Sequence, residues 1–190
     1  MKRFIIALII LVMAGNVFSQ NQKALQIGDK APSFKTMSDE GSLWDLKDYL
    51  GKKLIVVYFY PAAMTGGCTA QACSYRDHLP EIESANAIVV GISGDNVEGL
   101  KLFKKAENLN FALLSDETGE IAEKYGVPTK EGGSITREVD GQNFDLVRGK
   151  TASRWTFIID KEGKIAYKNE QVDAAKDAEK VLEFIKNYSK

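Results

Sequence analysis

The 190-residue sequence is poor in the residues that usually build metal sites, with two cysteines and one histidine. These are too few for a typical zinc site, which takes four cysteine or histidine ligands. Neither sign of charge dominates, since 25 Lys and Arg stand against 26 Asp and Glu. This balance gives no reason to expect a nucleic acid or an anionic membrane surface as a partner. The length suits one domain with a hydrophobic core.

The chain also lacks an apolar run at its start that is long enough to cross a bilayer. After a basic beginning, residues 4–14 are apolar, well short of the roughly 20 residues that a spanning helix needs. Val17 and Ser19 then occupy the −3 and −1 positions of a cleavage after Ser19. This pattern predicts a secretory signal peptide over residues 1–19 and an exported, periplasmic domain over 20–190, without stable membrane insertion. The alternative is a membrane anchor formed by residues 4–14.

Strand and helix patterns alternate through the rest of the chain. Continuous apolar runs predict buried strands at 54–60, 88–93, 111–114 and 155–159. Apolar spacing and capping residues predict helices at 68–84, 96–108, 116–126 and 173–188. Turn residues predict hairpins around 39–41 and 160–164. Together these elements indicate an α/β domain with a mixed sheet flanked by helices.

Two segments of this pattern are less regular. The helix at 68–84 contains Pro80, and we expect its register to break there because proline lacks a backbone donor. Residues 128–153 are rich in glycine and polar side chains, with a weak strand signal around 144–147, and we interpret them as an irregular surface excursion.

Cys68 and Cys73 lie at the junction between the first buried strand and the helix that follows it. A cysteine in the first helical turn meets unpaired N–H groups and the positive end of the helix dipole, which favour its thiolate. On an unbroken helix the two α-carbons would be about 8.7 Å apart, beyond the roughly 7 Å that a disulfide tolerates. The spacing therefore suits a switch that is helical when reduced and locally unwound when oxidised.

Two other interpretations of the cysteines stay open. A permanent bridge between Cys68 and Cys73 would close a small loop and stabilise the fold by only roughly 2 kcal/mol. Alternatively, Cys73 is a small buried apolar residue, which leaves Cys68 as a single reactive thiol.

Residues before Cys68 can shape its surroundings. Thr65 could cap the helix by accepting a hydrogen bond from the N–H of Cys68, and could also contact the sulfur or a bound oxygen. Pro61 fixes the exit of the chain from the strand and could shield the sulfur from water. Gly66 and Gly67 allow the backbone to approach a small ligand.

A thiolate also needs a cation, and the sequence offers two arginines. Arg154 directly precedes the strand at 155–159, and Arg76 lies within the cysteine helix. Either guanidinium could supply charge and several donors to a buried sulfur. His78 is the only histidine, and we interpret it as a solvated helix residue rather than a catalytic base.

The pattern Pro61-x-x-x-Thr65-x-x-Cys68 resembles the signature of the peroxiredoxins. The second cysteine at 73, followed by Tyr75-Arg76-Asp77, resembles the peroxiredoxin Q subfamily, also called bacterioferritin comigratory protein. The resemblance runs from about residue 28 to the C-terminus. Gly66 departs from it because the subfamily often has proline there, and Gln71 because glutamate is common there.

This resemblance implies a thioredoxin-like fold with an N-terminal hairpin extension, and thiol-dependent peroxidase activity. It implies that Cys68 is the peroxidatic cysteine, oxidised by a peroxide to sulfenic acid, and Cys73 the resolving cysteine of an intramolecular disulfide. Thr65 and Arg154 would orient the peroxide, and Pro61 would screen the site. A thioredoxin-like dithiol protein would reduce the disulfide, and no metal, haem or flavin cofactor is implied. We expect a monomer.

Two other classes of function compete with this interpretation. A thiol–disulfide oxidoreductase with a thioredoxin-like fold would also use two cysteines, but typically as Cys-x-x-Cys. A non-catalytic thioredoxin-like binding module would not need Thr65, Cys68 and an arginine together.

Overall fold

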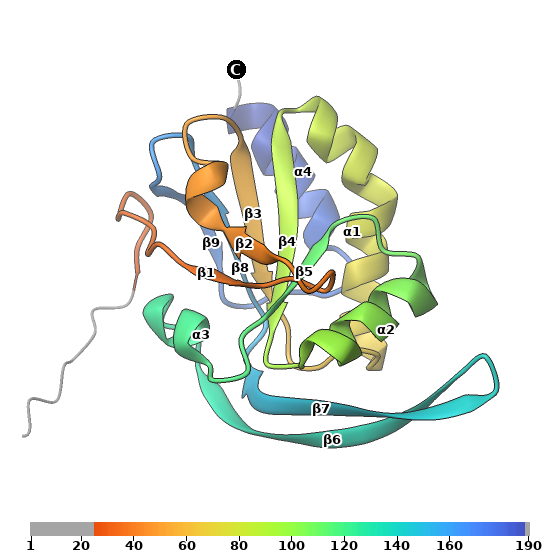
Figure 1. The fold of residues 1–190 in the computed structure, drawn as a ribbon. Coiled ribbons are helices and arrows are strands. Elements are labelled where there is room, and N and C mark those ends of the chain that lie inside the picture. Colours follow the sequence, from red (N-terminus) through yellow and green to blue (C-terminus); the bar gives the residue numbers. More distant parts are fainter. Residues whose placement is uncertain (1–24, 189–190) are drawn as a thin grey trace, which may run out of the picture.

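The computed structural model describes residues 25–188, which fold around a five-stranded mixed sheet with the strand order β5-β4-β3-β8-β9 (Figure 1). In that order the strands are Ala112–Ser115, Ala87–Ser93, Leu54–Phe59, Trp155–Ile159 and Ile165–Asn169. The central strand β3 pairs parallel with β4 and antiparallel with β8. The predicted α/β fold with a mixed sheet is confirmed. The predicted signal peptide, residues 1–19, lies outside the described residues.

Helices cover the sheet on both faces (Figure 1). The α-helices are α1 Gly66–Ser84, α2 Val97–Glu107, α3 Glu120–Lys124 and α4 Asp177–Tyr188. One core forms where α1, α2 and α4 pack on the sheet, and a second forms on the opposite face around α3 and the N-terminal hairpin. Every residue of β3 is buried because its side chains alternate between these two cores.

Both predicted hairpins are confirmed. The N-terminal hairpin joins β1, Lys35–Met37, to β2, Leu43–Asp45, and a 3₁₀ turn at Leu46–Asp48 follows it. The second hairpin joins β8 to β9 at the edge of the main sheet. The helices α3 and α4 begin four residues later than predicted, at Glu120 and Asp177.

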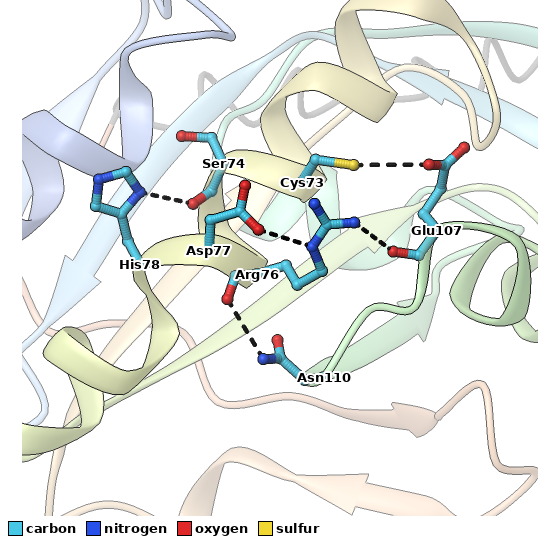
Figure 2. Close-up of polar contacts among 7 residues, drawn as sticks. All are labelled: Cys73, Ser74, Arg76, Asp77, His78, Glu107 and Asn110. Carbon is cyan, nitrogen blue, oxygen red and sulfur yellow. Dashed lines mark hydrogen bonds and ion pairs between the residues drawn. The ribbon is translucent and has the colours of Figure 1, made fainter.

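The predicted break of the long helix near Pro80 is wrong, because α1 runs without interruption from Gly66 to Ser84. Proline at position 80 removes the N–H that would bond the carbonyl of Arg76 four residues earlier. The side chain of Asn110 replaces that donor, with its Nδ2 3.3 Å from the Arg76 oxygen (Figure 2). A neighbouring loop therefore satisfies the carbonyl and lets the helix continue.

The prediction of an irregular excursion over 128–153 is also wrong. This segment forms a long antiparallel hairpin of β6, Thr129–Val139, and β7, Gln142–Ala152, which sweeps past α2 and α3 (Figure 1). The turn between the two strands consists of Asp140 and Gly141, which both have positive φ angles. Two-residue turns of this kind are the ones that β-hairpins favour. Most of its side chains are exposed on both faces, so the apolar alternation of a half-buried strand is missing.

The hairpin is attached to the body by backbone hydrogen bonds and by apolar side chains, of which Leu146 is the most deeply buried. Asn96 N donates to the carbonyl of Val147 at 3.0 Å, and Gly149 N donates to the carbonyl of Gly94 at 3.0 Å. Leu146 is fully buried in the core beside α2, whereas its neighbour Val147 is 47% exposed. Leu146 therefore anchors the hairpin to the domain.

We predict that Leu146→Ala lowers the free energy of unfolding by about 2–5 kcal/mol, because it leaves a cavity under the hairpin. Val147→Ala, a matched change at the adjacent exposed position, should shift it by about 0.5 kcal/mol or less. Chemical denaturation of both variants measures the difference. Equal effects of the two substitutions would contradict the anchoring role of Leu146.

Candidate active site

The first predicted site residue, Cys68, lies in the first turn of α1, directly beyond the C-terminal end of β3. Thr65 is the N-cap residue of this helix and has an extended backbone. The sulfur is buried, with only 2% of the residue exposed. The structure thus confirms the predicted location of the sulfur, where a strand passes into a helix. The unpaired N–H groups of the helix start surround it there.

Arg154 is the arginine that reaches this sulfur. Its Nη2 donates to Cys68 Sγ at 3.3 Å. The two residues are far apart in the sequence, but β8 pairs antiparallel with β3 and places Trp155 opposite Phe59. Arg154 therefore stands beside the end of β3, where α1 begins.

Arg76 lies two turns further along α1, near Cys73 rather than Cys68. Its Nε donates to Asp77 at 2.9 Å, and its Nη1 donates to the backbone carbonyl of Glu107 at 2.6 Å (Figure 2). His78 bonds through Nδ1 to the carbonyl of Ser74 at 2.8 Å. Of the two candidate arginines, only Arg154 contacts Cys68.

The predicted capping bond of Thr65 is wrong. Its hydroxyl donates backwards to the carbonyl of Ala62 at 2.8 Å, and the side chain makes no capping hydrogen bond to α1. The hydroxyl is held by the loop that precedes the helix, so it does not compete for the helical N–H groups. Those groups stay available to negative charge at the Cys68 sulfur.

The loop before α1 is fixed by a buried carboxylate that the sequence analysis did not single out as a site residue. Asp95 Oδ2 accepts from the backbone N–H of Ala63 at 2.8 Å and from the hydroxyl of Ser93 at 2.8 Å. Burial raises the pKa of Asp95, and these hydrogen bonds oppose that rise. Because Asp95 follows β4, the neighbour of β3, it reaches across to hold the loop that leads to Cys68.

Pro61 is half-buried and lines a surface hollow of about 360 Å³. The hollow lies between the end of β3 and the base of the β6–β7 hairpin, and its other lining residues include Pro128 and Thr151. Gly67 is close to the arginine, since a Cβ added there would lie 3.4 Å from Arg154 Nη2. A glycine at this position leaves room for the guanidinium.

Gln71 is a site residue that the sequence analysis noted only as a departure from the subfamily. Its side chain is fully buried, and its Oε1 accepts from Arg154 Nη1 at 2.5 Å. Its Nε2 donates to Asp177 on α4 at 2.8 Å. Gln71 follows Cys68 by three residues and shares its helix face, which is the signal that could have marked it.

Cys73 lies one turn further along α1 and is half-buried. Its Sγ donates to Glu107 Oε2 at 3.7 Å (Figure 2). Cys68 and Cys73 are both free thiols. With α1 intact between them, the helix geometry holds their α-carbons about 8.7 Å apart, too far for a disulfide.

Burial is the main factor that raises the pKa of the Cys73 thiol. The carboxylate of Glu107 raises it further, while the guanidinium of Arg76 lowers it. A neighbouring negative charge disfavours the thiolate and a hydrogen bond from the thiol stabilises the protonated form. Cys68 thus has the guanidinium of Arg154 beside its sulfur, whereas Cys73 lies near both the carboxylate of Glu107 and the guanidinium of Arg76.

Comparison with known proteins places this site in a family. The model of the AhpC/TSA family matches residues 27–168. The chain belongs to this family. Within it, peroxiredoxin Bcp of Escherichia coli K12 is 36% identical over 165 residues, which cover 87% of this chain and 98% of the relative. A peroxiredoxin Bcp relative from Coxiella burnetii is 40% identical over 143 residues, with 75% and 87% of the two chains covered.

Solved structures of the same group share the fold. The crystal structure of peroxidoxin BcpB from Mycobacterium tuberculosis has a TM-score of 0.71 and 30% identity, and the match covers 86% of this chain and 97% of that one. A cysteine-to-serine variant of Xylella fastidiosa PrxQ has a TM-score of 0.73 and 26% identity, with 88% and 99% covered. The chain is therefore a peroxiredoxin of the Bcp/peroxiredoxin Q type with a thioredoxin-like fold, and a thiol-dependent peroxidase, as the sequence predicts.

For this peroxiredoxin we predict that Glu107→Gln lowers the pKa of the Cys73 thiol, because it removes the negative charge that disfavours the thiolate. The pH dependence of alkylation by iodoacetamide, measured in a Cys68→Ser background, reports this single thiol. Glu98→Gln, on the same helix but away from Cys73, is the control and should leave the profile in place. An unchanged or higher pKa in the Glu107 variant would refute the assignment.

Proposed function

We propose that Cys68 is the peroxidatic cysteine of this peroxiredoxin and that Cys73 is its resolving cysteine. The observation that carries the assignment is the contact of Arg154 Nη2 with Cys68 Sγ at 3.3 Å, at the start of a helix. A guanidinium and the helix dipole both favour a thiolate over a thiol. The Cys73 thiol instead donates to the carboxylate of Glu107, whose negative charge disfavours a thiolate.

In the first step, the Cys68 thiolate attacks one oxygen of hydrogen peroxide or an organic hydroperoxide. An S–O bond forms, the O–O bond breaks, and the departing oxygen takes a proton to leave as water or an alcohol. The two-electron reduction of the peroxide is matched by oxidation of Cys68 to a sulfenic acid. Arg154 has five N–H donors, and two nitrogens are committed to Cys68 and Gln71.

Thr65 and Pro61 have supporting roles in this proposal. The Thr65 hydroxyl donates to Ala62, so its lone pairs can still accept a hydrogen bond. The N–H groups of α1 do not use them, because Thr65 makes no capping bond to this helix. It can accept the O–H of a bound peroxide while Arg154 donates to the second oxygen. Pro61 begins the loop from β3 and limits access of water from the hollow that it lines.

The second step needs a change in α1. The first turns of the helix unwind, Cys73 loses its proton, and its sulfur attacks the sulfenic sulfur of Cys68. An S–S bond forms, the S–O bond breaks, and the hydroxyl leaves as water. A thioredoxin-like dithiol protein then reduces the intramolecular disulfide by thiol–disulfide exchange. The intact helix of the free-thiol form supports this order of events, since the two cysteines cannot join in that form.

This mechanism predicts different results for the two cysteine variants. Cys68→Ser should abolish peroxide consumption. Cys73→Ser should keep a rapid first turnover and accumulate a sulfenic acid that dimedone traps, with no intramolecular disulfide by mass spectrometry. The wild type after one equivalent of peroxide should show the Cys68–Cys73 disulfide within one chain. Peroxide consumption by Cys68→Ser at the wild-type rate would refute the assignment.

We also propose that the protein acts outside the cytoplasm, so that its reductant is an exported dithiol protein. The basic start and the apolar residues 4–14 support this. Between residues 25 and 188, no helix is both long and apolar enough to cross a bilayer.

Expression of the full chain in a bacterial host tests the export proposal. We expect the periplasmic fraction to contain a protein whose intact mass matches a chain beginning at Gln20. The matched control replaces Val17 with Asp, because a charged residue at the −3 position blocks recognition of the cleavage site. A full-length product in the cytoplasmic fraction would refute cleavage and export, and one held in the membrane fraction would support an anchor instead.

A further inference from the structure

We propose that Asp177 is a positioning residue: its buried carboxylate fixes the orientation of the Gln71 amide, which in turn holds Arg154 against Cys68. This inference rests on the proposed roles of Cys68 and Arg154. It concerns a residue on α4 that lies outside the sequence motif.

The carboxylate of Asp177 is the centre of a buried polar cluster. Asp177 is the first residue of α4 and is fully buried. Its Oδ2 accepts hydrogen bonds from Gln71 Nε2 at 2.8 Å, from the Tyr75 hydroxyl at 2.7 Å and from the Thr156 hydroxyl at 2.7 Å. Two of the donors come from α1 and the third from β8. One carboxylate thus ties the cysteine helix to α4 and to the strand that follows Arg154.

The donor and acceptor properties of this chain of contacts allow only one arrangement. Asp177 Oδ2 accepts at all three of its contacts, and a guanidinium can only donate hydrogen bonds. Gln71 stands between the two, and its amide has one end of each kind. Because Asp177 takes the NH₂ end at 2.8 Å, the carbonyl end faces Arg154 at 2.5 Å. The opposite orientation would set the amide NH₂ against the guanidinium and the amide oxygen against the carboxylate.

The guanidinium is consequently held at two of its nitrogens. Nη1 is bound to Gln71, and Nη2 is left to donate to Cys68 Sγ. Gln71 and Asp177 are both fully buried, so water does not compete for these groups and a wrong orientation would leave buried polar atoms unpaired. Asp177 therefore acts on the reactive sulfur through two intervening side chains.

The hydrogen bond between Gln71 and Asp177 is present in the helical form of α1. Gln71 lies between Cys68 and Cys73, so unwinding that joins the cysteines must separate Gln71 from Asp177. The link therefore favours the form that reacts with peroxide over the form that makes the disulfide. Loss of Asp177 should slow the first step and speed the second, whereas general damage to the fold would slow both.

The first test is Asp177→Ala in full-length protein, compared with Tyr75→Phe. Asp177→Ala removes all three hydrogen bonds at Asp177 Oδ2, whereas Tyr75→Phe removes one of them and leaves the Gln71 contact in place. We expect Asp177→Ala to slow the first turnover roughly tenfold, measured in a Cys73→Ser background, which is the effect of one charge-assisted hydrogen bond. With Cys73 present, disulfide formation should become faster.

A second test conserves the volume of the cluster and stays decisive if the alanine variant does not fold. Gln71→Glu places a second carboxylate against Asp177, and two carboxylates in one site share a proton or repel each other. We expect the first turnover to gain a new ionisation and to fall as pH rises through it. Adding Asp177→Asn supplies an NH₂ donor to the new carboxylate, and the Tyr75 and Thr156 hydroxyls can rotate to suit it. The double variant should lose the new pH dependence.

Two outcomes would overturn the proposal: a double variant that keeps the pH dependence of Gln71→Glu, or an Asp177→Ala variant that matches Tyr75→Phe in the rates of both steps. Failure of the proposed function would show separately, as peroxide consumption by Cys68→Ser.

Discussion

The contact between the Arg154 guanidinium and the Cys68 sulfur organises this protein. It joins two residues that only the sheet brings together, because β8 runs antiparallel beside β3 and delivers Arg154 to the point where α1 begins. The sulfur is buried and the contact is partly buried, so water screens the positive charge less than it would at the surface. The loop held by Asp95 and the amide of Gln71 fix the two partners from either side. The fold thereby brings a cation to the sulfur from a distant part of the sequence.

The two ends of the cysteine pair have different chemistry although one helix carries both. Cys68 is buried beside a cation at the helix start, and Cys73 is half-buried beside the carboxylate of Glu107. A sulfur that attacks peroxide benefits from ionisation, whereas a resolving sulfur needs to stay unreactive until its partner is oxidised. The raised pKa of Cys73, due first to burial and then to Glu107, suits that second requirement.

The sequence predicts this architecture well where apolar patterns report on burial, and poorly where polar contacts link distant segments. The strands β3, β4 and β8 carry continuous apolar runs because both faces of the central sheet are covered. The hairpin over 129–152 lacks such a pattern because most of it faces solvent, and its local signals are a weak strand pattern at 144–147 and the turn residues Asp140-Gly141. The Thr65 hydroxyl could either accept from a helical N–H or donate to the carbonyl of Ala62. Only the geometry of the loop decides between these two bonds, so the predicted cap was wrong. Gln71 and Asp177 are 106 residues apart, and no local rule connects them.

The composition of α1 explains why unwinding would be confined to its start. Gly66 and Gly67 occupy its first two positions, and glycine in a helix is about 1 kcal/mol less favourable than alanine. Further along, the core between α1 and the sheet buries Tyr75, Leu79 and Ile82. The side chain of Asn110 also donates to the Arg76 carbonyl that Pro80 leaves without a helical partner. The helix is thus weak where Cys68 must move and strong beyond Cys73. Between these two parts stands Gln71, whose bonds to Arg154 and Asp177 hold the weak turn in place. In the proposed mechanism, oxidation of Cys68 changes the charge that Arg154 faces, and so acts on the same set of contacts that keeps the two sulfurs apart.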